Sequence, residues 1–515
     1  MASQKQWSRM LIFTTVLLAV SAFNYGFSDQ AFSSCQAMDS FARQFGVYHP
    51  STGKYKVKPL FTSLYNSLKA GTQIVGESRT FQGYGVFANL FATGVFLGGY
   101  ISNTYGRKWC IFSMNLYALG SAAVLVSSKT DAQLLTGRAL HYIYLGMQLA
   151  VIPTTLAELA PRNVRGAMGV LYWLSIKIGG LVVTGIARGT SGISTNAAWQ
   201  IPFGLILVIP FICIWLVWII PESPRWLLLR DRQEEALQAL KRYRSKTTPE
   251  HEIQEDFDEM AQKVTAQLQK KSFKDLFIKG NRERTFVVAA ANFFQQASGQ
   301  AFASQYGTLF VKQLKSVNAF SVTLGTNATD IGALIISTAL SDVVGRRMLF
   351  HVSGFLETAS LMTMGGLGTA DPSNTAAKEG IVAMLLLYSF GWSLAWAPLV
   401  YVLGAELPSA GLREMTLRIA YTVKLITEFA VTFSYPYLET ADDPGHVDIG
   451  GKLGFIYGSL SAVSVIFGYF FIPETRKLEL EDINKKYESS TESEVEQKVE
   501  YQVGLREVGR SGGPN

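Results

Sequence analysis

The chain has 515 residues, of which 48% are hydrophobic and 17% are charged, whereas soluble proteins carry about 25% charged residues. A chain made mainly of soluble domains is therefore excluded, and no Walker-type phosphate loop supports ATP-driven chemistry. The three cysteines and five histidines lack metal-ligand spacing, and no nucleophile–base constellation indicates an enzyme, so no cofactor is expected.

Apolar stretches long enough to cross a bilayer recur from one end of the sequence to the other. Such a helix needs about 20 mostly apolar residues, because its backbone polar groups can only be satisfied within the helix. The sequence predicts twelve transmembrane helices: 10–27, 82–102, 109–126, 140–156, 167–187, 203–220, 286–311, 320–340, 348–368, 381–403, 415–437 and 453–472. The first is predicted to be a retained helix, because no small-residue cleavage site follows its apolar core.

Two stretches, 60–76 and 82–102, compete as the start of the second helix, although only one crossing is allowed. Two crossings would move Arg107 and Lys108 to the other side of the membrane. Joining TSLYNSLKAGTQIVG at 62–76 directly to VFLGGYISNTYGRK at 95–108 gives one uninterrupted stretch, and the codons at both junctions can carry splice-site-like strings in frame. We hypothesise that 77–93 is an unspliced intron; a genuine loop insertion is the alternative.

Basic residues cluster in alternate short links between the predicted helices. Because basic residues favour the cytoplasmic side, these links and both termini are predicted to be cytoplasmic, in a multi-pass protein of the plasma membrane. The same positions explain the net charge of +7 without nucleic acid as a partner. The clusters are Arg107/Lys108, Arg162/Arg165, Arg346/Arg347 and Arg413/Arg418.

Three motifs of the first half recur in the second half, each at an offset near half the chain length. GGYISNTYGRK at 98–108 is answered by STALSDVVGRR at 337–347, Glu158…Arg165 by Glu406…Arg413, and Pro221-Glu222-Ser223 by Pro473-Glu474-Thr475. The repeat predicts two six-helix bundles, 1–220 and 285–472. Residues 221–284 are predicted to form cytoplasmic helices that begin after Ser223 as the N-cap, and residues 473–515 a cytoplasmic tail.

Seven motifs in one order along nearly the whole chain resemble the sugar porter branch of the major facilitator superfamily, and among its members the fungal sugar transporters. They are GRK at 106–108, Glu158 with Arg165-Gly166, PESPRWL at 221–227, Gln295-Gln296 with Gly299, Asp342 with GRR at 345–347, Glu406 with Arg413, and PETRK at 473–477. The resemblance implies an all-α membrane protein of the major-facilitator fold, with twelve transmembrane helices in two pseudo-symmetric bundles.

The same resemblance implies a function. A monomeric secondary transporter is expected, which moves a sugar or sugar-like polar solute by alternating access, with proton coupling. The alternatives are a uniporter of the same fold and a non-transporting sugar sensor, which the short tail disfavours.

The charged motif residues are predicted to form a gate at the cytoplasmic helix ends. Pairs between such residues must break when that side opens, so they bias a two-state equilibrium without touching the substrate. The first cluster comprises Arg107, Glu158 and Arg165, and the second comprises Asp342, Arg346, Glu406 and Arg413. The alternative is that the basic members only set topology. Asn103 stands where the family has an aspartate, which removes one charge from the first cluster.

The resemblance assigns substrate contacts to helices that face each other between the bundles. The predicted contacts are Gln295, Gln296 and Tyr306 on the seventh helix, Trp396 and Tyr401 on the tenth, and Glu428 on the eleventh. A buried amide without a partner is costly in lipid, which favours a functional role for the two glutamines.

Several of these positions depart from the family pattern. Trp173 replaces a glutamine and Glu428 an asparagine, while Lys177 and Lys424 add charges within helices. Lys424 and Glu428 share one helix face and could form a structural pair, although a charge at membrane depth usually marks function. A carboxylated or otherwise modified sugar or polyol therefore competes with a neutral mono- or disaccharide as the substrate.

Proton-coupled relatives pair an aspartate on the first helix with an arginine on the fourth. Arg138 fits the arginine, but the aligned position on the first helix is Ser28, with Asp29 beside it. One residue corresponds to a rotation of about 100° on a helix. Asp29 is predicted to be the proton carrier, and a solvated loop aspartate is the alternative.

Overall fold

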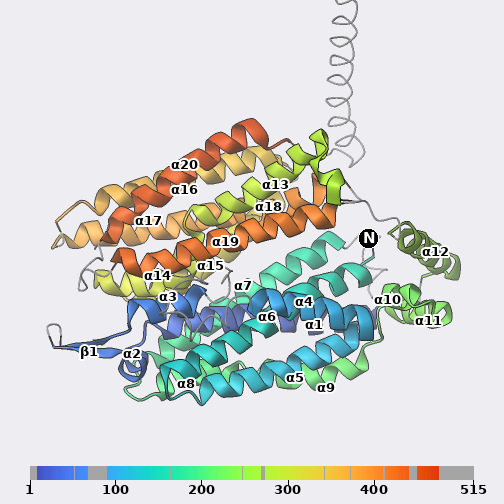
Figure 1. Ribbon diagram of the computed structural model, residues 1–515, viewed down its shortest axis with the longest axis horizontal. Coiled ribbons are helices and arrows are strands. Elements are labelled where there is room, and N and C mark those ends of the chain that lie inside the picture. Colours follow the sequence, from blue (N-terminus) through green and yellow to red (C-terminus); the bar gives the residue numbers. More distant parts are fainter. Residues whose placement is uncertain are drawn as a thin grey trace, which may run out of the picture.

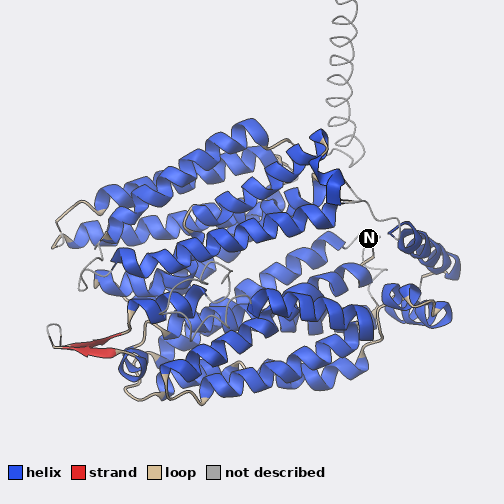
Figure 2. Cartoon of the chain, in the orientation of Figure 1, coloured by secondary structure: helices blue, strands red, loops and turns tan. Residues whose placement is uncertain are grey.

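Two bundles of long α-helices lie side by side and make up almost all of the described chain (Figure 1). The computed structural model describes residues 8–50, 53–67, 90–161, 165–245, 248–267, 273–341, 343–371, 373–409, 412–439 and 449–474. Figure 2 shows helix throughout, except for one antiparallel strand pair, β1 (Val47–His49) and β2 (Lys54–Lys56). The predicted all-α fold with two six-helix bundles is confirmed.

The first bundle contains the helices of the first half of the chain, drawn in blue to green in Figure 1. Its spans are α1 (Arg9–Cys35), α3 (Pro59–Ser67) with α4 (Leu90–Tyr105), α5 (Arg107–Val126), α6 (Asp131–Leu159), α7 (Arg165–Thr190), and α8 (Ala197–Leu205) with α9 (Val208–Leu216) and η6 (Val217–Ile219). A short helix, α2 (Asp39–Phe45), packs beside the strand pair. Ser8 caps α1 by accepting a hydrogen bond from the Leu11 amide.

The second bundle contains the helices of the second half, drawn in yellow-green to red. Its spans are α13 (Lys279–Ala297) with α14 (Gln300–Leu314), α15 (Ala319–Leu340), α16 (Arg346–Leu367), α17 (Thr375–Leu394) with α18 (Trp396–Glu406), α19 (Arg413–Glu439), and α20 (Leu453–Phe471) after η8 (Gly450–Lys452). The two bundles meet along a seam where α7 packs on α15, α3 on α19, and α1 on α14.

Two predicted spans are broken helices. Residues 286–311 divide at Gly299, whose φ of 95° suits glycine and whose added Cβ would lie 2.7 Å from the Tyr457 ring. Residues 381–403 divide at Ala395, because Pro398 has no amide hydrogen to continue the helix from α17 into α18. Each break leaves backbone carbonyls that the helix itself does not satisfy.

The second span is formed by two helices, α3 and α4, which follow α6 in the same direction. The Tyr65 carbonyl of α3 contacts Arg138, and Gly94 of α4 lies against the backbone of Ile143. Both stretches that compete as the start of this span contain helix, since α3 falls mainly in 60–76 and α4 covers 90–102 of the other stretch. Of the hypothesised intron, only 90–93 belong to the described residues, where they begin α4.

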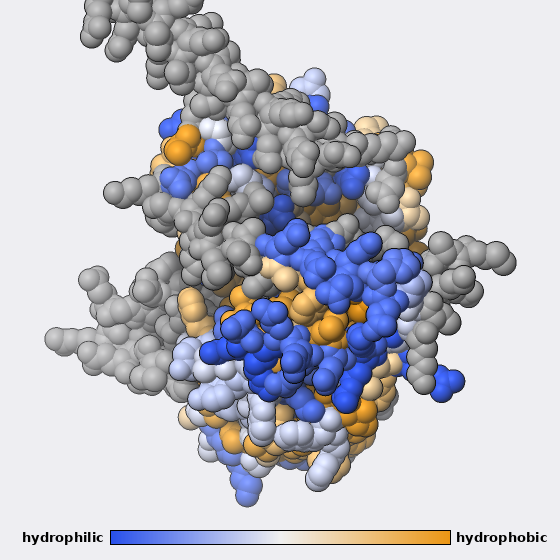
Figure 3. Space-filling model, turned by 90° about the vertical axis from the view of Figure 1, so that its right-hand side faces the viewer, coloured by the Kyte–Doolittle hydropathy of each residue, from blue (hydrophilic) through white to orange (hydrophobic). Residues whose placement is uncertain are grey.

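Short helices connect the two bundles outside the membrane-spanning part. They are α10 (Pro224–Leu229), α11 (Gln233–Tyr243), α12 (Glu250–Gln267) and η7 (Phe273–Phe277). Ser223 caps α10, with Pro224 at the first helical position. Figure 3 looks onto this end of the molecule, where a hydrophilic surface surrounds a few apolar residues.

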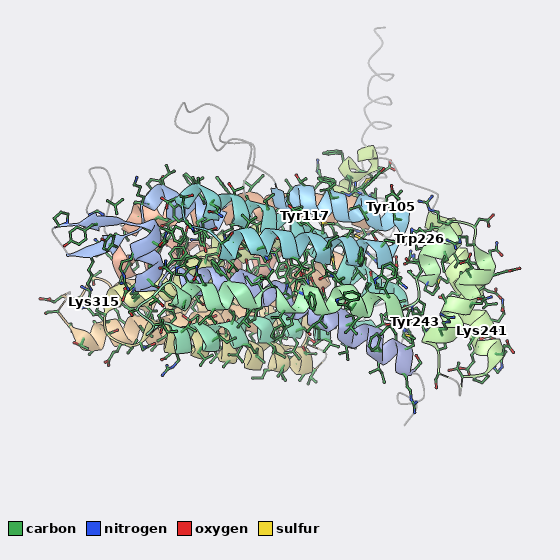
Figure 4. All side chains as sticks on the ribbon, turned by 90° about the horizontal axis from the view of Figure 1, so that it is seen from below. Tyr105, Tyr117, Trp226, Lys241, Tyr243 and Lys315 are labelled. Carbon is green, nitrogen blue, oxygen red and sulfur yellow. The ribbon has the colours of Figure 1, made fainter. Side chains whose placement is uncertain are left out.

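The molecule has two distinct ends, which we call the linker end and the hairpin end. The linker end carries α10–α12 and the start of α1, and the hairpin end carries α2, β1 and β2 (Figure 1). In Figure 4, Trp226, Tyr243 and Lys241 lie at the linker end and Lys315 at the hairpin end.

Between these ends, the helices present apolar side chains outward. Seven helical segments among the described residues are long and apolar enough to cross a membrane. Large apolar residues are exposed on them, such as Trp215 at 66% and Phe470 at 71%. The spans α6, α16 and α19 are as long but carry charged residues along the helix. An outer face of this kind is suited to lipid.

Candidate functional site

At the linker end of the first bundle, Arg107 and Glu158 form a buried bidentate ion pair. The Arg107 Nε and Nη2 atoms donate to the two Glu158 carboxylate oxygens at 2.9 and 2.6 Å. Both side chains are 9% exposed, and Ser223 Oγ donates to Glu158 Oε2 at 2.7 Å. This geometry is the strong form of a charge-assisted hydrogen bond.

Glu222 holds the start of α5 beside this pair. Its Oε1 accepts from the Arg107 amide at 2.8 Å, and its Oε2 from the Lys108 amide at 3.2 Å. A carboxylate here satisfies amides that the helix leaves open and faces the positive end of the helix dipole. Burial raises the pKa of Glu222, while hydrogen bonds from backbone amides act in the opposite direction.

The second bundle repeats this arrangement at its own linker end. The Arg346 Nη2 atom lies 3.4 Å from Glu406 Oε1, and Glu474 accepts from the amides of Arg346 and Arg347 at 3.1 and 3.2 Å. Gly345, like Gly106, has a positive φ, of 102° and 104° respectively. The repeat visible in the sequence is thus a repeat of specific contacts.

The structure therefore brings together part of each predicted gate cluster. Arg107 joins Glu158, and Arg346 joins Glu406, and both pairs lie within one bundle. Arg165 begins α7, and Arg413 begins α19 and is partly buried. The Arg165 side chain and the whole of Asp342 lie outside the described residues. The backbone carbonyl of Asn103 accepts a hydrogen bond from Trp226 Nε1 at 2.9 Å, a contact that does not depend on the residue type at this position.

At the hairpin end, the two bundles are joined across the seam by hydrogen bonds to backbone carbonyls and by one ion pair. Ser33 of α1 donates to the Ser304 carbonyl at 2.8 Å, and Ser63 of α3 to the Phe433 carbonyl at 3.0 Å. The ammonium of Lys312 contacts an Asp39 oxygen at 2.6 Å, which lowers the pKa of Asp39. These contacts close the seam at this end.

Tyr306 takes part in the same closure. It is fully buried, and its hydroxyl donates to the Thr432 carbonyl of α19 at 2.7 Å. Its ring packs on Tyr435 with centroids 4.4 Å apart. The structure places Tyr306 among the residues that close the hairpin end, and its contact with substrate stays a prediction.

The glutamines at the end of α13 lie at the centre of the second bundle. Gln295 is 1% exposed, and its Nε2 donates to the Trp396 carbonyl at 2.9 Å. That carbonyl lies at the break between α17 and α18, so Gln295 has a structural role that the sequence argument did not include. Trp392 Nε1 donates to the Gln295 carbonyl at 3.1 Å. Gln296 is buried beside it, at 6% exposure.

Aromatic rings and ammonium groups meet across the seam near mid-depth. Trp173 of α7 lies against Tyr401 of α18, with ring centroids 4.7 Å apart. The Lys424 ammonium contacts the Tyr401 hydroxyl at 2.6 Å, and Glu428 is buried one turn further along α19. Trp396 faces away from this contact, because it is 1% exposed and packs on Phe350 within the second bundle.

An ion pair between Lys177 and Asp330 also crosses the seam. Lys177 Nζ of α7 lies 2.7 Å from Asp330 Oδ2 of α15, and Ser389 Oγ donates to the other Asp330 oxygen at 2.7 Å. The sequence analysis noted Lys177 but missed Asp330. The available signal was a single carboxylate within the apolar stretch 320–340.

Arg138 occupies an aromatic pocket within the first bundle. Its guanidinium carbon lies 3.7, 4.4 and 4.7 Å from the ring centroids of Phe32, Tyr65 and Tyr142. The side chain is fully buried, and neither Nη atom has a hydrogen-bond partner among the described residues. Ser28 is fully buried one helical turn before Phe32, and Asp29 next to it is partly buried.

Comparison with known proteins identifies relatives of this arrangement. Residues 14–487 match the family described as Sugar (and other) transporter. The High glucose sensor RGT2 of Saccharomyces cerevisiae is 29% identical over 437 residues, which cover 82% of this chain and 57% of the sensor. The Probable glucose transporter rco-3 of Neurospora crassa is 24% identical over 489 residues, which cover 93% of this chain and 79% of that protein.

Among solved structures, the inward-open conformation of the xylose transporter XylE from E. coli has the same fold. The TM-score is 0.70 at 18% identity, and the match covers 92% of this chain and 99% of XylE.

Proposed function

Because the chain belongs to the Sugar (and other) transporter family of the major facilitator superfamily, we propose that it moves a sugar or sugar-like polar solute by alternating access. It is a multi-pass membrane protein and not an enzyme. The observation that carries the proposal is the distribution of contacts along the seam. Polar contacts such as Ser33–Ser304 and Lys177–Asp330 join the bundles at the hairpin end and at mid-depth. Two ion pairs at the linker end, Arg107–Glu158 and Arg346–Glu406, each lie within one bundle.

This distribution corresponds to one of the two states of an alternating-access cycle. Arg107, Lys108, Arg346 and Arg347 favour a cytoplasmic location for the linker end, which makes the closed hairpin end external. Return to the other state requires the hairpin-end contacts to break. New contacts between the charged helix ends of the two bundles at the linker end would compensate for that loss.

The substrate site of this proposal lies at the centre of the seam. Gln296 offers an amide, and the contacting Trp173 and Tyr401 offer aromatic faces and a hydroxyl, a combination suited to a hydroxylated solute. The names of the relatives, a glucose sensor, a glucose transporter and a xylose transporter, support a sugar as the starting hypothesis.

Proton coupling forms the finer part of the proposal. Neither Nη atom of Arg138 has a hydrogen-bond partner among the described residues, a cost that an approaching carboxylate would relieve. Asp29 is one residue from the Ser28 face, so a rotation of α1 by about 100° would bring its carboxylate toward Arg138. A uniporter, with Ser28 in place of the coupling aspartate, is the alternative.

A sugar sensor is the second candidate, and the similarity to RGT2 favours it. The chain spans 57% of the length of that sensor. A sensor would bind sugar and change conformation without net uptake, so binding and transport must be measured separately.

The decisive experiment is uptake of radiolabelled solutes by a fungal host that lacks its own sugar transporters. The wild-type chain, tagged and located at the plasma membrane, is expected to take up at least one member of a panel of sugars and sugar acids. Binding without uptake would identify a sensor. Neither binding nor uptake across the panel would contradict the proposal.

A further inference from the structure

The Lys177–Asp330 ion pair joins the two bundles in the middle of their membrane-spanning helices. Both oxygens of Asp330 are satisfied, one by the Lys177 ammonium and one by the Ser389 hydroxyl, each at 2.7 Å. The Asp330 side chain is 5% exposed. A charge at this depth is costly unless it is paired, so the pair is an arrangement that the surrounding helices must support.

The two partners differ in their access to the seam. The Lys177 side chain is 26% exposed, against 5% for Asp330. An ammonium carries three donors, and the centroid of the Trp392 ring lies 5.7 Å from the ammonium of Lys177. Trp392 in turn donates to the Gln295 carbonyl, so Lys177 borders the candidate substrate site.

A second ammonium, that of Lys424, also lies at the seam. Trp173 is one turn from Lys177 on α7 and packs on Tyr401, whose hydroxyl contacts Lys424 at 2.6 Å. The two positive charges of the lysines are formally neutralised by the negative charges of Asp330 and Glu428. The seam therefore offers two cationic donors beside aromatic faces, and any additional negative charge requires a compensating proton.

Building on the proposed transport function, we propose that Lys177 anchors a carboxylate of the substrate, which makes the substrate a sugar acid or a similarly hydroxylated carboxylic acid. The substrate carboxylate replaces Asp330 as the partner of Lys177. Asp330 keeps its hydrogen bond with Ser389 and takes one proton from water, because an unpaired carboxylate at this depth is strongly disfavoured. One anion and one proton enter together, so the seam gains no net charge.

The groups that act on Asp330 come from the helices packed around α15. Lys177 of α7 attracts a negative charge there, and Tyr388 of α17 is close enough to interact electrostatically with it. From α14, Thr308 contacts Thr323 of α15 at 2.8 Å through neutral hydroxyls. Among the described residues, Lys177 is thus the cation paired with Asp330, and its capture by a substrate carboxylate removes that partner.

The test compares galacturonate with galactose, which differ by one carboxylate, in the transporter-null host. The wild type is expected to take up galacturonate faster at pH 5 than at pH 7. Lys177→Gln should raise the half-saturating concentration of galacturonate about 10-fold or more, the effect of losing a charge-assisted hydrogen bond, and change that of galactose less than about 2-fold. Asp330→Asn should remove the part of the pH dependence that is specific to galacturonate, so that galacturonate and galactose uptake then respond to pH alike.

Two sets of variants separate this role from folding. The charge-neutral double variant, Lys177→Gln with Asp330→Asn, removes the pair without leaving a lone charge and should still lose galacturonate affinity. Lys312→Gln and Asp39→Asn remove a matched Lys–Asp pair across the seam at the hairpin end, and should leave the ratio of galacturonate to galactose uptake unchanged.

The outcomes distinguish this inference from the proposed function. Wild-type galactose uptake without galacturonate binding, or wild-type galacturonate affinity in the double variant, overturns the carboxylate site and leaves sugar transport standing. A correctly located wild-type protein that takes up neither solute, nor any other sugar or sugar acid of the panel, overturns the transport function itself.

Discussion

Gly106 and Glu222 lie so close together that a Cβ added to the glycine would be 2.3 Å from a Glu222 carboxylate oxygen. The glycine also has a φ of 104°, which other residues rarely adopt. Gly345 and Glu474 repeat this relationship in the second bundle, with the added Cβ at 2.6 Å. The carboxylate caps therefore depend on the absence of a side chain at both glycines.

Gly106→Ala should destabilise the first bundle, because it combines a strained φ with a collision against Glu222. We expect a loss of about 1–3 kcal/mol, measured as a lower melting temperature in detergent. Gly120→Ala in α5 is the matched control, since nothing lies within 4 Å of its added Cβ. An equal effect of both substitutions would contradict this account of the cap.

Gln296→Ala should weaken substrate binding while the protein remains stable. Losing one hydrogen bond to a neutral group costs about 0.5–1.5 kcal/mol, which corresponds to an increase of about 2- to 12-fold in the half-saturating concentration. Gln295→Ala should in addition lower the melting temperature, because Gln295 bonds the Trp396 carbonyl at the helix break. The exposed Gln254 of α12 provides the control substitution. Normal uptake by both variants would show that neither glutamine contacts the substrate.

Glu406→Gln should impair cycling more than binding. The substitution keeps the shape of the side chain and removes the charge that faces Arg346 at 3.4 Å. Equilibrium binding in detergent should persist while net uptake falls. Glu235→Gln, in an exposed pair with Arg232 on α11, should have little effect, because such surface pairs contribute about 0–1 kcal/mol. Lost binding with intact exchange would assign Glu406 to the substrate site instead.

If Asp29 carries the coupling proton, uptake should increase as the external pH falls from about 7 to about 5. Asp29→Asn imitates the protonated carboxyl, so it should abolish uphill accumulation and preserve exchange of preloaded substrate. Asp371→Asn in an exposed turn is the control. A wild-type protein that never accumulates its substrate, and whose uptake does not change with pH, is a facilitator. The buried Ser28 at the family's aspartate position would explain that result.

Sequencing the transcript tests the intron hypothesis for 77–93. Mature transcripts should lack these codons, and the shorter chain should join α3 to α4 in one helix. The register permits it, because Gly94 lies against the backbone of Ile143 and Gly76 would take its place at the junction. A mature transcript that retains the codons would establish the segment as a genuine insertion.

The sequence predicted the features that rest on composition and repetition. Apolar length indicated the spans, and the repeated charged motifs indicated that Arg107 would lie near Glu158. The helix breaks at Gly299 and Ala395 were not predicted, because both lie inside apolar stretches without a gap in hydrophobicity. Asp330 was missed for a related reason: its partner, Lys177, is on a helix of the other bundle, and no local spacing connects them.

The Glu222 and Glu474 caps each tie the end of a bundle's last helix to the beginning of its third. The glutamate after the last helix of each bundle therefore holds that bundle together without help from the other bundle. The segment that joins the two bundles begins directly after Glu222 and continues through α10–α12. Motion of one half against the other can therefore be absorbed by that segment, and neither half needs to loosen its own helices.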